Sequence, residues 1–344
     1  MKISILYAGR AAPFVGWLVI DELAELLAHY FQAELLSPQP LSTRLISRVL
    51  RRSRTRYAPL DSNGGDVLIV VANAPGSLSM INAIPHCRKK FKKIYGVICD
   101  SYFQKGFVSE TEQFDAITVT AHEDIEYPAS RFHIPVFQLD HGVDGLTWAP
   151  RTEMVRTVDL IAYGRTPPSY HAQFMQRFHA ARSPYLYLHS PLGNLSGPDV
   201  RLERGMLFKL LHRSSVSLAF NLLVEPTNSR PRSMMVTSRW LESLLAGCIV
   251  AGIRPVSRMA DEMLFWPDAT VEISEDPVLA TDQLEELLSR KDLDAQRQTN
   301  IAHILEHHDW RYRILSLCQL FDLPVPESLQ EDISQLKTLR QTFA

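Results

Sequence analysis

The chain has 344 residues, 46% hydrophobic and 22% charged, which is enough for two globular domains. Its formal net charge of -2 argues against a general nucleic-acid binder. No apolar run reaches the roughly 18 residues that span a bilayer, and the N-terminal MKISILYAG is typical of a first strand rather than a signal peptide. The cysteines form no CxxC pair, which predicts buried, reduced thiols; they are Cys87, Cys99, Cys248 and Cys318. We therefore expect a cytoplasmic protein.

Strands and helices alternate along the chain in two series. In the first, the predicted strands are Lys2–Ala8, Asp66–Asn73, Lys93–Cys99, Ala116–Ala121 and Val136–Leu139, and the predicted helices are Trp17–Phe31, Thr43–Arg54 and Ser77–Cys87. In the second, the strands are Val158–Tyr163, Tyr185–His189, Val216–Phe220, Ile249–Gly252 and Thr270–Ile273, and the helices lie near Tyr170–Ala181, Glu203–His212, Met235–Leu245 and Thr281–Arg290. Apolar, β-branched strands that alternate with helices predict parallel sheets. The expected fold is α/β, with two Rossmann-like doubly wound domains facing a cleft.

The expected domains are 1–150, for the acceptor, and 151–322, for the nucleotide sugar, followed by a helical tail at 323–344. The hinge is predicted near Ala149–Thr157, where Trp148-Ala149-Pro150 breaks the pattern. Pro324 and Pro326 mark a break in the helical C-terminal region.

The segment SRWLESLLAGCIVAGIRP, Ser238–Pro255, has the most specific pattern in the chain. Its apolar residues at helical spacing predict a stripe against a sheet; they are Trp240, Leu241, Leu244 and Leu245. Gly247 is placed for a left-handed helix stop, and Cys248–Ala251 suits a buried strand. Arg239 and Glu242 stand at i, i+3 on the other side, where they are expected to be free to meet a ligand.

Doubly wound sheets bind ligands at the carboxyl ends of their strands, where helix N-termini attract anions. In the second domain, the residues at or after these strand ends are Gly164, Arg165, Asn221 and Glu225. Phosphate can be held by Thr237, Ser238 and the amides of the helix that follows. Arg165 can bond a diphosphate; its alternative is an exposed loop arginine. In the first domain they offer Gly9, Arg10, Asp100 and His122. Asp100 suits an acceptor hydroxyl or a general base, and His122 suits acid–base chemistry; a helix N-cap is the alternative for His122 and Glu123.

The Ser238–Pro255 pattern resembles the "R-x-x-E-x-x-A-x-G" helix and strand of GT-B glycosyltransferases, in the CgeB-like and family-4-type groups (glycosyltransferase group 1). Gln138–Pro150, QLDHGVDGLTWAP, resembles the "P-x-G-V-D-…-F-x-P" segment that closes their first domain; His141, Gly142, Val143, Asp144, Trp148 and Pro150 carry the likeness. Gly142 permits close backbone approach, and turn or cap roles are the alternatives for His141 and Asp144. In GT-B enzymes the last helices often cross back to the first domain, which this tail is long enough to do.

The resemblance implies sugar transfer from a nucleotide-diphosphate sugar to an unidentified acceptor, with retention of the anomeric configuration. It also implies that Glu242, matching the second glutamate of the family-4 pair, contacts the ribose; a solvated helix face is the alternative. No metal or other cofactor is expected, and Arg165 and Arg239 are expected to stabilise the leaving group. The first glutamate falls at Met234, and Met235-Val236-Thr237 replaces the glycine-rich loop. A non-catalytic nucleotide-sugar binder, or a GT-B hydrolase or epimerase, therefore stays open.

Two basic clusters, Arg44–Arg56 and Arg88–Lys93, are either solvated faces or surfaces for anionic lipid or a phosphate-bearing acceptor.

In His307-His308-Asp309-Trp310-Arg311 the adjacent histidines point in different directions, which argues against one shared metal ion. A similar "H-x-W-x-x-R" element recurs in CgeB-like proteins, and we interpret it as packing of the closing helix.

Overall fold

A computed structural model describes residues 1–9, 15–41, 56–102, 106–152, 155–189, 200–221 and 233–343. Arg10, Glu225, the predicted helix Thr43–Arg54 and the basic cluster Arg44–Arg56, except Arg56 itself, lie outside these described residues. The chain forms two compact units. Unit 1 contains Met1–Asp140 and Arg313–Gln330, and unit 2 contains His141–Tyr312 and Glu331–Ala344.

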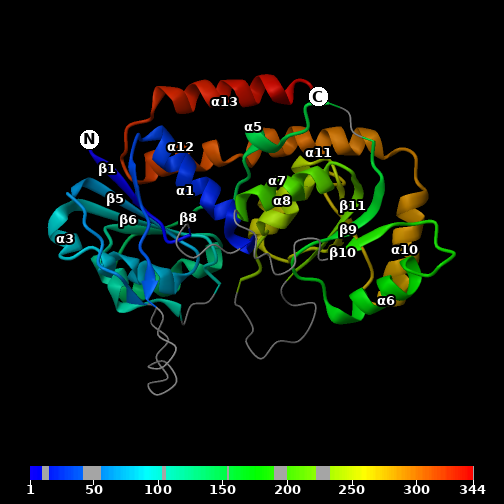
Figure 1. Cartoon of the computed structure of the whole chain (residues 1–344), viewed down its shortest axis with the longest axis horizontal. Coiled ribbons are helices and arrows are strands. Elements are labelled where there is room, and N and C mark those ends of the chain that lie inside the picture. Colours follow the sequence, from blue (N-terminus) through cyan, green and yellow to red (C-terminus); the bar gives the residue numbers. More distant parts are fainter. Residues whose placement is uncertain are drawn as a thin grey trace, which may run out of the picture. The chain divides into compact units, whose positions relative to one another are not determined.

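Unit 1 is built on a six-stranded parallel sheet in the order β2-β1-β5-β6-β7-β8 (Figure 1). The strands are β1 (Ile3–Leu6), β2 (Glu34–Leu36), β5 (Gly65–Ala72), β6 (Phe91–Ile98), β7 (Ala116–Val119) and β8 (Val136–Gln138). Two short segments, β3 (Pro40–Leu41) and β4 (Arg56–Tyr57), pair antiparallel. The five strands predicted for this half are confirmed. The three-residue β2 was not predicted, because it is too short to show periodicity.

The helices that accompany this sheet are η1 (Val15–Trp17), α1 (Leu18–Tyr30), η2 (Pro75–Ala83), α3 (Cys87–Lys90), η4 (Ser109–Gln113), η5 (His122–Asp124) and α4 (Glu126–Phe132), where η marks a 3-10 helix. The helix predicted at Ser77–Cys87 is instead the 3-10 helix η2. Pro85 disfavours the α conformation of the residue before it, and Ile84 is extended at φ -96° and ψ 106°. The chain therefore breaks there, and α3 begins separately at Cys87.

Unit 2 is built on a five-stranded parallel sheet in the order β10-β9-β11-β12-β13. The strands are β9 (Val158–Ala162), β10 (Tyr187–His189), β11 (Ser214–Phe220), β12 (Ile249–Ile253) and β13 (Val271–Glu272), as predicted to within a few residues. Leu218 of β11 packs in one apolar cluster with Phe174 and Leu284. The neighbouring Ser217 bonds Ser243 from the opposite face, so helices cover both faces.

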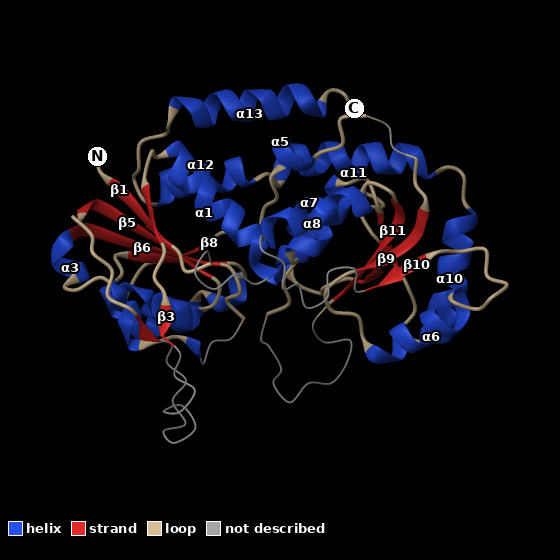
Figure 2. Ribbon diagram, in the orientation of Figure 1, coloured by secondary structure: helices blue, strands red, loops and turns tan. Residues whose placement is uncertain are grey.

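The remaining helices are α5 (Gly145–Trp148), α6 (Pro168–Phe178), α7 (Val200–Leu211), α8 (Ser238–Leu245), α9 (Arg258–Met263), α10 (Pro277–Ser289), α11 (Leu293–His307), α12 (Trp310–Leu320) and α13 (Glu327–Arg340), shown in blue in Figure 2. The apolar stripe of α8 is confirmed, because its four members are at most 1% exposed. Gly247 is left-handed at φ +74°, the predicted helix stop. The tail is helical, with the break between α12 and α13 at the two prolines.

Both units are doubly wound α/β domains, which confirms the predicted fold class. All four cysteines are buried, as expected, and within the described residues none forms a disulfide. Among the described helices, none is long and apolar enough to cross a membrane.

Candidate functional site

The carboxyl edge of the unit 2 sheet carries the main candidate site. From β9 the sheet extends through β10 on one side and through β11 on the other, so the chain reverses direction across the sheet at this point. Such a switch point is where open α/β sheets bind ligands. Tyr163, Gly164 and Arg165 follow β9 directly at this edge.

Arg165 and Arg239 lie together at the switch point. The Nη1 atom of Arg239 donates a hydrogen bond to the Arg165 carbonyl oxygen at 2.7 Å. Gly164 is left-handed at φ +71°, and a Cβ there would lie 2.5 Å from Nη2 of Arg239. Glycine is therefore needed at position 164 for two reasons: the backbone is left-handed, and a Cβ would clash with the guanidinium of Arg239. Arg165 is exposed, and within the described residues its guanidinium contacts no carboxylate.

Arg239 lies beside an aromatic ring and near a second guanidinium group. Its guanidinium lies 5.8 Å from the centroid of the Tyr163 ring. Burial lowers the pKa of Arg239; Tyr163 and Glu242 oppose this shift and the neighbouring Arg165 adds to it. Because a bound anion would offset the repulsion between the two guanidinium groups, the site is suited to a phosphate group.

The N-terminus of α8 adds backbone donors to this edge. Thr237 precedes the helix in an extended conformation, at φ -82° and ψ 166°, and its side chain makes no capping hydrogen bond within the described residues. Ser238 is the first helical residue. First-turn amides and the helix dipole both favour an anion. Thr237 and Ser238 are thus placed as predicted, on the same helix as Arg239.

The expectation that Glu242 is free to meet a ligand is wrong, and so is the alternative of a solvated face. Glu242 is 3% exposed. Its Oε1 accepts from Nη1 of the buried Arg204 at 2.7 Å, and its Oε2 accepts from the Tyr163 hydroxyl at 3.1 Å. The Tyr163 hydroxyl also lies 3.2 Å from Oγ of Ser243. Burial raises the pKa of Tyr163 well above its usual value, so the hydroxyl stays protonated and donates. Ribose binding by Glu242 is not tested by this geometry and stays a prediction.

Asn221 joins the ends of two strands. Its backbone N–H donates to the Ile253 carbonyl at 3.0 Å, and its Nδ2 donates to the Arg254 carbonyl at 3.2 Å. These bonds hold the carboxyl ends of β11 and β12 together. Its predicted role in ligand binding stays a prediction.

Gly9 and Asp100 also follow strands, in unit 1. A Cβ on Gly9 would lie 2.2 Å from the Tyr7 ring, and the Tyr7 hydroxyl donates to Asp21. Burial and Asp21 raise the pKa of Tyr7 far above its usual value. Asp100 is half-buried, and its backbone N–H donates to the Asn73 carbonyl at 2.8 Å. Gly9 is thus needed for packing of Tyr7.

His122 is an exposed residue of η5. The cap of η5 is Ala121 and that of α4 is Ile125, so the N-cap alternative for His122 and Glu123 is wrong. A buried carboxylate that sequence reasoning missed lies in the same turn: Asp124 accepts from the Ser101 hydroxyl at 2.5 Å. The predicted acid–base roles of Asp100 and His122 stay predictions.

Residues 141–150 of the first motif pack against residues 307–311 of the second in unit 2. A Cβ on Gly142 would lie 2.8 Å from the Trp310 ring, so the close approach that glycine permits is to Trp310. His141 is 5% exposed beside the same ring. Asp144 caps α5 by accepting from Thr147 N at 3.2 Å and pairs with Arg311 at 2.8 Å. The packing interpretation of the second motif is thereby confirmed.

The second basic cluster is extensively paired. Arg88 and Lys93 bind Asp115 at 2.8 and 3.2 Å, and Lys92 binds Asp66 at 2.6 Å. The side chain of Lys90 is 3.9 Å from Asp61. These carboxylates offset much of the positive charge, and contact with an anionic lipid or acceptor stays a prediction.

A cavity of about 860 Å³ lies at the opposite, amino edge of the unit 2 sheet, away from Arg165 and Arg239. Arg156 and Arg297 line it, but both bind backbone carbonyls there: Arg156 that of Ala246 at 3.1 Å, and Arg297 that of Ser215 at 3.1 Å. Their guanidinium groups therefore support the sheet edge, and size alone does not make this cavity the site.

Comparisons with known proteins address the fold and part of the sequence. The sequence profile of a family described as "Glycosyl transferase-like" matches residues 172–319. Among solved structures, the chain is similar to Alr3699/HepE of Anabaena in complex with UDP-glucose, at 9% identity and a TM-score of 0.55 over 94% of this chain and 99% of that chain. It is also similar to sucrose-phosphate synthase from Thermosynechococcus elongatus, at 11% identity and a TM-score of 0.55 over 94% and 98%. The fold is GT-B.

Other matches are partial. The match to TarM of S. aureus has 12% identity and a TM-score of 0.47, and it covers 74% of this chain and 55% of TarM. A comparison with curated protein sequences gave no match.

Proposed function

We propose that this protein is a glycosyltransferase that takes its sugar from a nucleotide-diphosphate donor. The observation that carries the proposal is that two arginines, Arg165 and Arg239, lie together at the switch point of the sheet. The guanidinium of Arg239, in the first turn of α8, bonds the backbone carbonyl of Arg165. The family profile spans α8, and the similar HepE structure contains UDP-glucose. UDP-glucose is therefore the first donor to test.

In the proposed reaction, the bond between the anomeric carbon and the β-phosphate oxygen breaks, and the acceptor oxygen bonds to the anomeric carbon. The acceptor's hydroxyl proton passes to the departing nucleotide diphosphate or to solvent. Negative charge builds on the departing nucleotide diphosphate. We propose that Arg165, Arg239 and the amides of Thr237 and Ser238 bind that charge, and that binding it more tightly in the transition state lowers the barrier. Retention, metal independence, a hexosyl donor and the CgeB-like subtype belong to this proposal as expectations from the family resemblance.

The arginines are tested by Arg165→Lys and Arg239→Lys. Lysine keeps the charge but loses the planar fork, so we expect turnover to fall about 100-fold, more than donor affinity falls. Calorimetry with UDP and a donor-consumption assay separate the two effects. Arg177→Lys is the matched control, because Arg177 is an exposed arginine of the same unit that pairs with Glu285. A loss of UDP affinity with unchanged turnover would assign the arginines to ground-state binding only.

Metal independence is tested by assaying transfer with EDTA. Activity that survives chelation supports stabilisation by the arginines. If EDTA abolishes transfer and a divalent ion restores it, the role belongs to a metal.

A non-catalytic binder is the second candidate, favoured by the position of Glu242. Both of its carboxylate oxygens are bonded within the protein, and Met234 stands where the resemblance expects the first glutamate. UDP binding without donor turnover in a screen of hydroxylated acceptors would select this candidate.

A further inference from the structure

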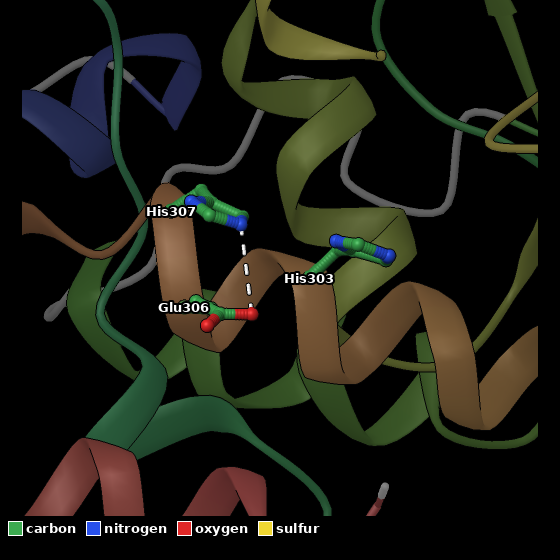
Figure 3. A group of neighbouring side chains, drawn as sticks. All are labelled: His303, Glu306 and His307. Carbon is green, nitrogen blue, oxygen red and sulfur yellow. Dashed lines mark ion pairs between the residues drawn. The ribbon is translucent and has the colours of Figure 1, made fainter. Parts of the chain in front are cut away.

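His303, Glu306 and His307 form a cluster on α11 that the sequence analysis did not recognise. Their positions i, i+3 and i+4 place them on one side of the helix, and Figure 3 shows the three side chains projecting from neighbouring turns. One ligand atom from each lies within 4.8 Å of the others. The adjacent His307 and His308 point in different directions, whereas the spacing H-x-x-E-H in HILEH brings His303, Glu306 and His307 together.

The cluster is held in place by aromatic residues. The His303 ring stacks on Trp266, with centroids 4.6 Å apart and planes at 11°. Trp266 is fixed in turn, because its Nε1 donates to Asn300 at 2.7 Å. Phe265 lies edge-on to His307 at 5.2 Å. The Nδ1 atom of His303 is buried and has no hydrogen-bond partner within the described residues. Among the residues that the structure describes, this ring nitrogen is therefore available to a ligand.

The donor set suits a zinc-like ion. Zinc binds imidazole nitrogen and carboxylate oxygen at about 2.0–2.2 Å, which puts ligand atoms in a tetrahedral site roughly 3.3 Å apart. Histidines at i and i+4 on a helix are a recurrent zinc pair, and imidazole selects zinc, copper, nickel or cobalt over magnesium and calcium.

We propose that His303, Glu306 and His307 form a site for one divalent transition-metal ion, with a water molecule completing the coordination. The proposal stands apart from sugar transfer. Arg340 is the competing cation, because its Nε lies 2.9 Å from Oε2 of Glu306. A metal ion and the Arg340 guanidinium would therefore repel each other and compete for this carboxylate. An ion here would cross-link two turns at the C-terminal end of α11.

The test is metal titration of tag-free protein that has been treated with EDTA and dialysed. We expect calorimetry to give one equivalent of Zn²⁺, and Co²⁺ to give visible d–d bands without thiolate charge transfer. His303→Phe keeps the stack on Trp266, and His307→Gln removes the second imidazole; each should weaken binding about 10-fold or more. Arg340→Gln should strengthen it, because the competing charge is gone. Circular dichroism checks that each variant is folded.

His133→Asn is the control, since His133 is an exposed histidine of unit 1 at φ +55°, a conformation that asparagine tolerates. It should leave Zn²⁺ binding unchanged. Full binding by the His303→Phe/His307→Gln double variant, or a thiolate band with Co²⁺, would overturn the proposal. UDP affinity of His307→Gln is measured alongside; its loss without loss of metal binding would also overturn the assignment. Failure of the glycosyltransferase proposal leaves this result unaffected.

Discussion

At the residue scale, Glu242 has a structural partner of opposite charge. Glu242→Ala leaves the buried Arg204 without this carboxylate, and breaking a buried pair on one side costs about 3–5 kcal/mol. We expect urea unfolding to show a loss of that size. Glu242→Leu combined with Arg204→Met should recover much of it, because neither charge is then buried. A Glu242→Ala variant of unchanged stability but weakened UDP binding would instead favour the ribose role.

Asp309 is a second buried carboxyl, with an unusual pH dependence. Burial raises its pKa to about 6, even though Arg311 and the Gly145 N–H favour its charged form. A raised folded-state pKa contributes stability that is complete below the unfolded pKa near 4 and is lost as pH rises through 6. The free energy of unfolding, compared with that of the Asp309→Asn variant, should therefore rise by roughly 3 kcal/mol as pH falls from 7 to 4.

Asp115 is expected to give stability the opposite dependence on pH. Although burial would raise its pKa, bonds from Ile94 N, Lys93 and Arg88 lower it overall. Relative to Asp115→Asn, the protein should lose stability as pH falls through the acid range. Denaturant titrations of both variants across pH check the pair, and a flat difference for Asp309 would show that Arg311 keeps it charged throughout.

At the scale of elements, the turn from α8 to β12 depends on Gly247. Its φ is +74°, and a Cβ there would lie 2.6 Å from Nη2 of Arg156. Gly247→Ala should cost about 1–2 kcal/mol from the left-handed conformation, and more if Arg156 loses its carbonyl bonds. Gly205 in α7 is the matched control, since nothing lies within 4 Å of its would-be Cβ. Gly205→Ala should stabilise by about 0.5–1 kcal/mol. Equal effects in thermal unfolding would contradict this account.

At the scale of the whole molecule, unit 1 is completed by residues far along the chain. Phe321 stacks on Tyr95 of β6, with centroids 4.2 Å apart and planes at 2°, and it is 3% exposed. Phe321→Ala should cost unit 1 about 3–5 kcal/mol. Hydrogen exchange should accelerate in β6 although the substitution lies more than 200 residues later. Exchange that changes only within α12 would contradict this. The domain limits predicted at residues 150 and 322 stay predictions.

The sequence alone determined the features that depend on local periodicity. The alternation of strands and helices predicted two parallel sheets, and the spacing of Trp240, Leu241, Leu244 and Leu245 predicted the buried side of α8. Gly247 could be recognised because a helix stop needs only the residue that tolerates a left-handed backbone. These signals lie within a few residues of one another and survive in any tertiary context.

The tertiary structure alone decided which side chains meet. Arg239 reaches the Arg165 carbonyl across 74 residues of sequence, and Glu242 meets Arg204 and Tyr163 across 38 and 79. Helical periodicity placed Glu242 opposite the apolar stripe, but it could not show that α7 and β9 bring a cation and a hydroxyl to that side. Burial and pairing depend on neighbours that only folding supplies. For this reason the sequence could predict that Arg165 follows β9 and that Arg239 lies in the first turn of α8, while the partners of Glu242 came only from the structure.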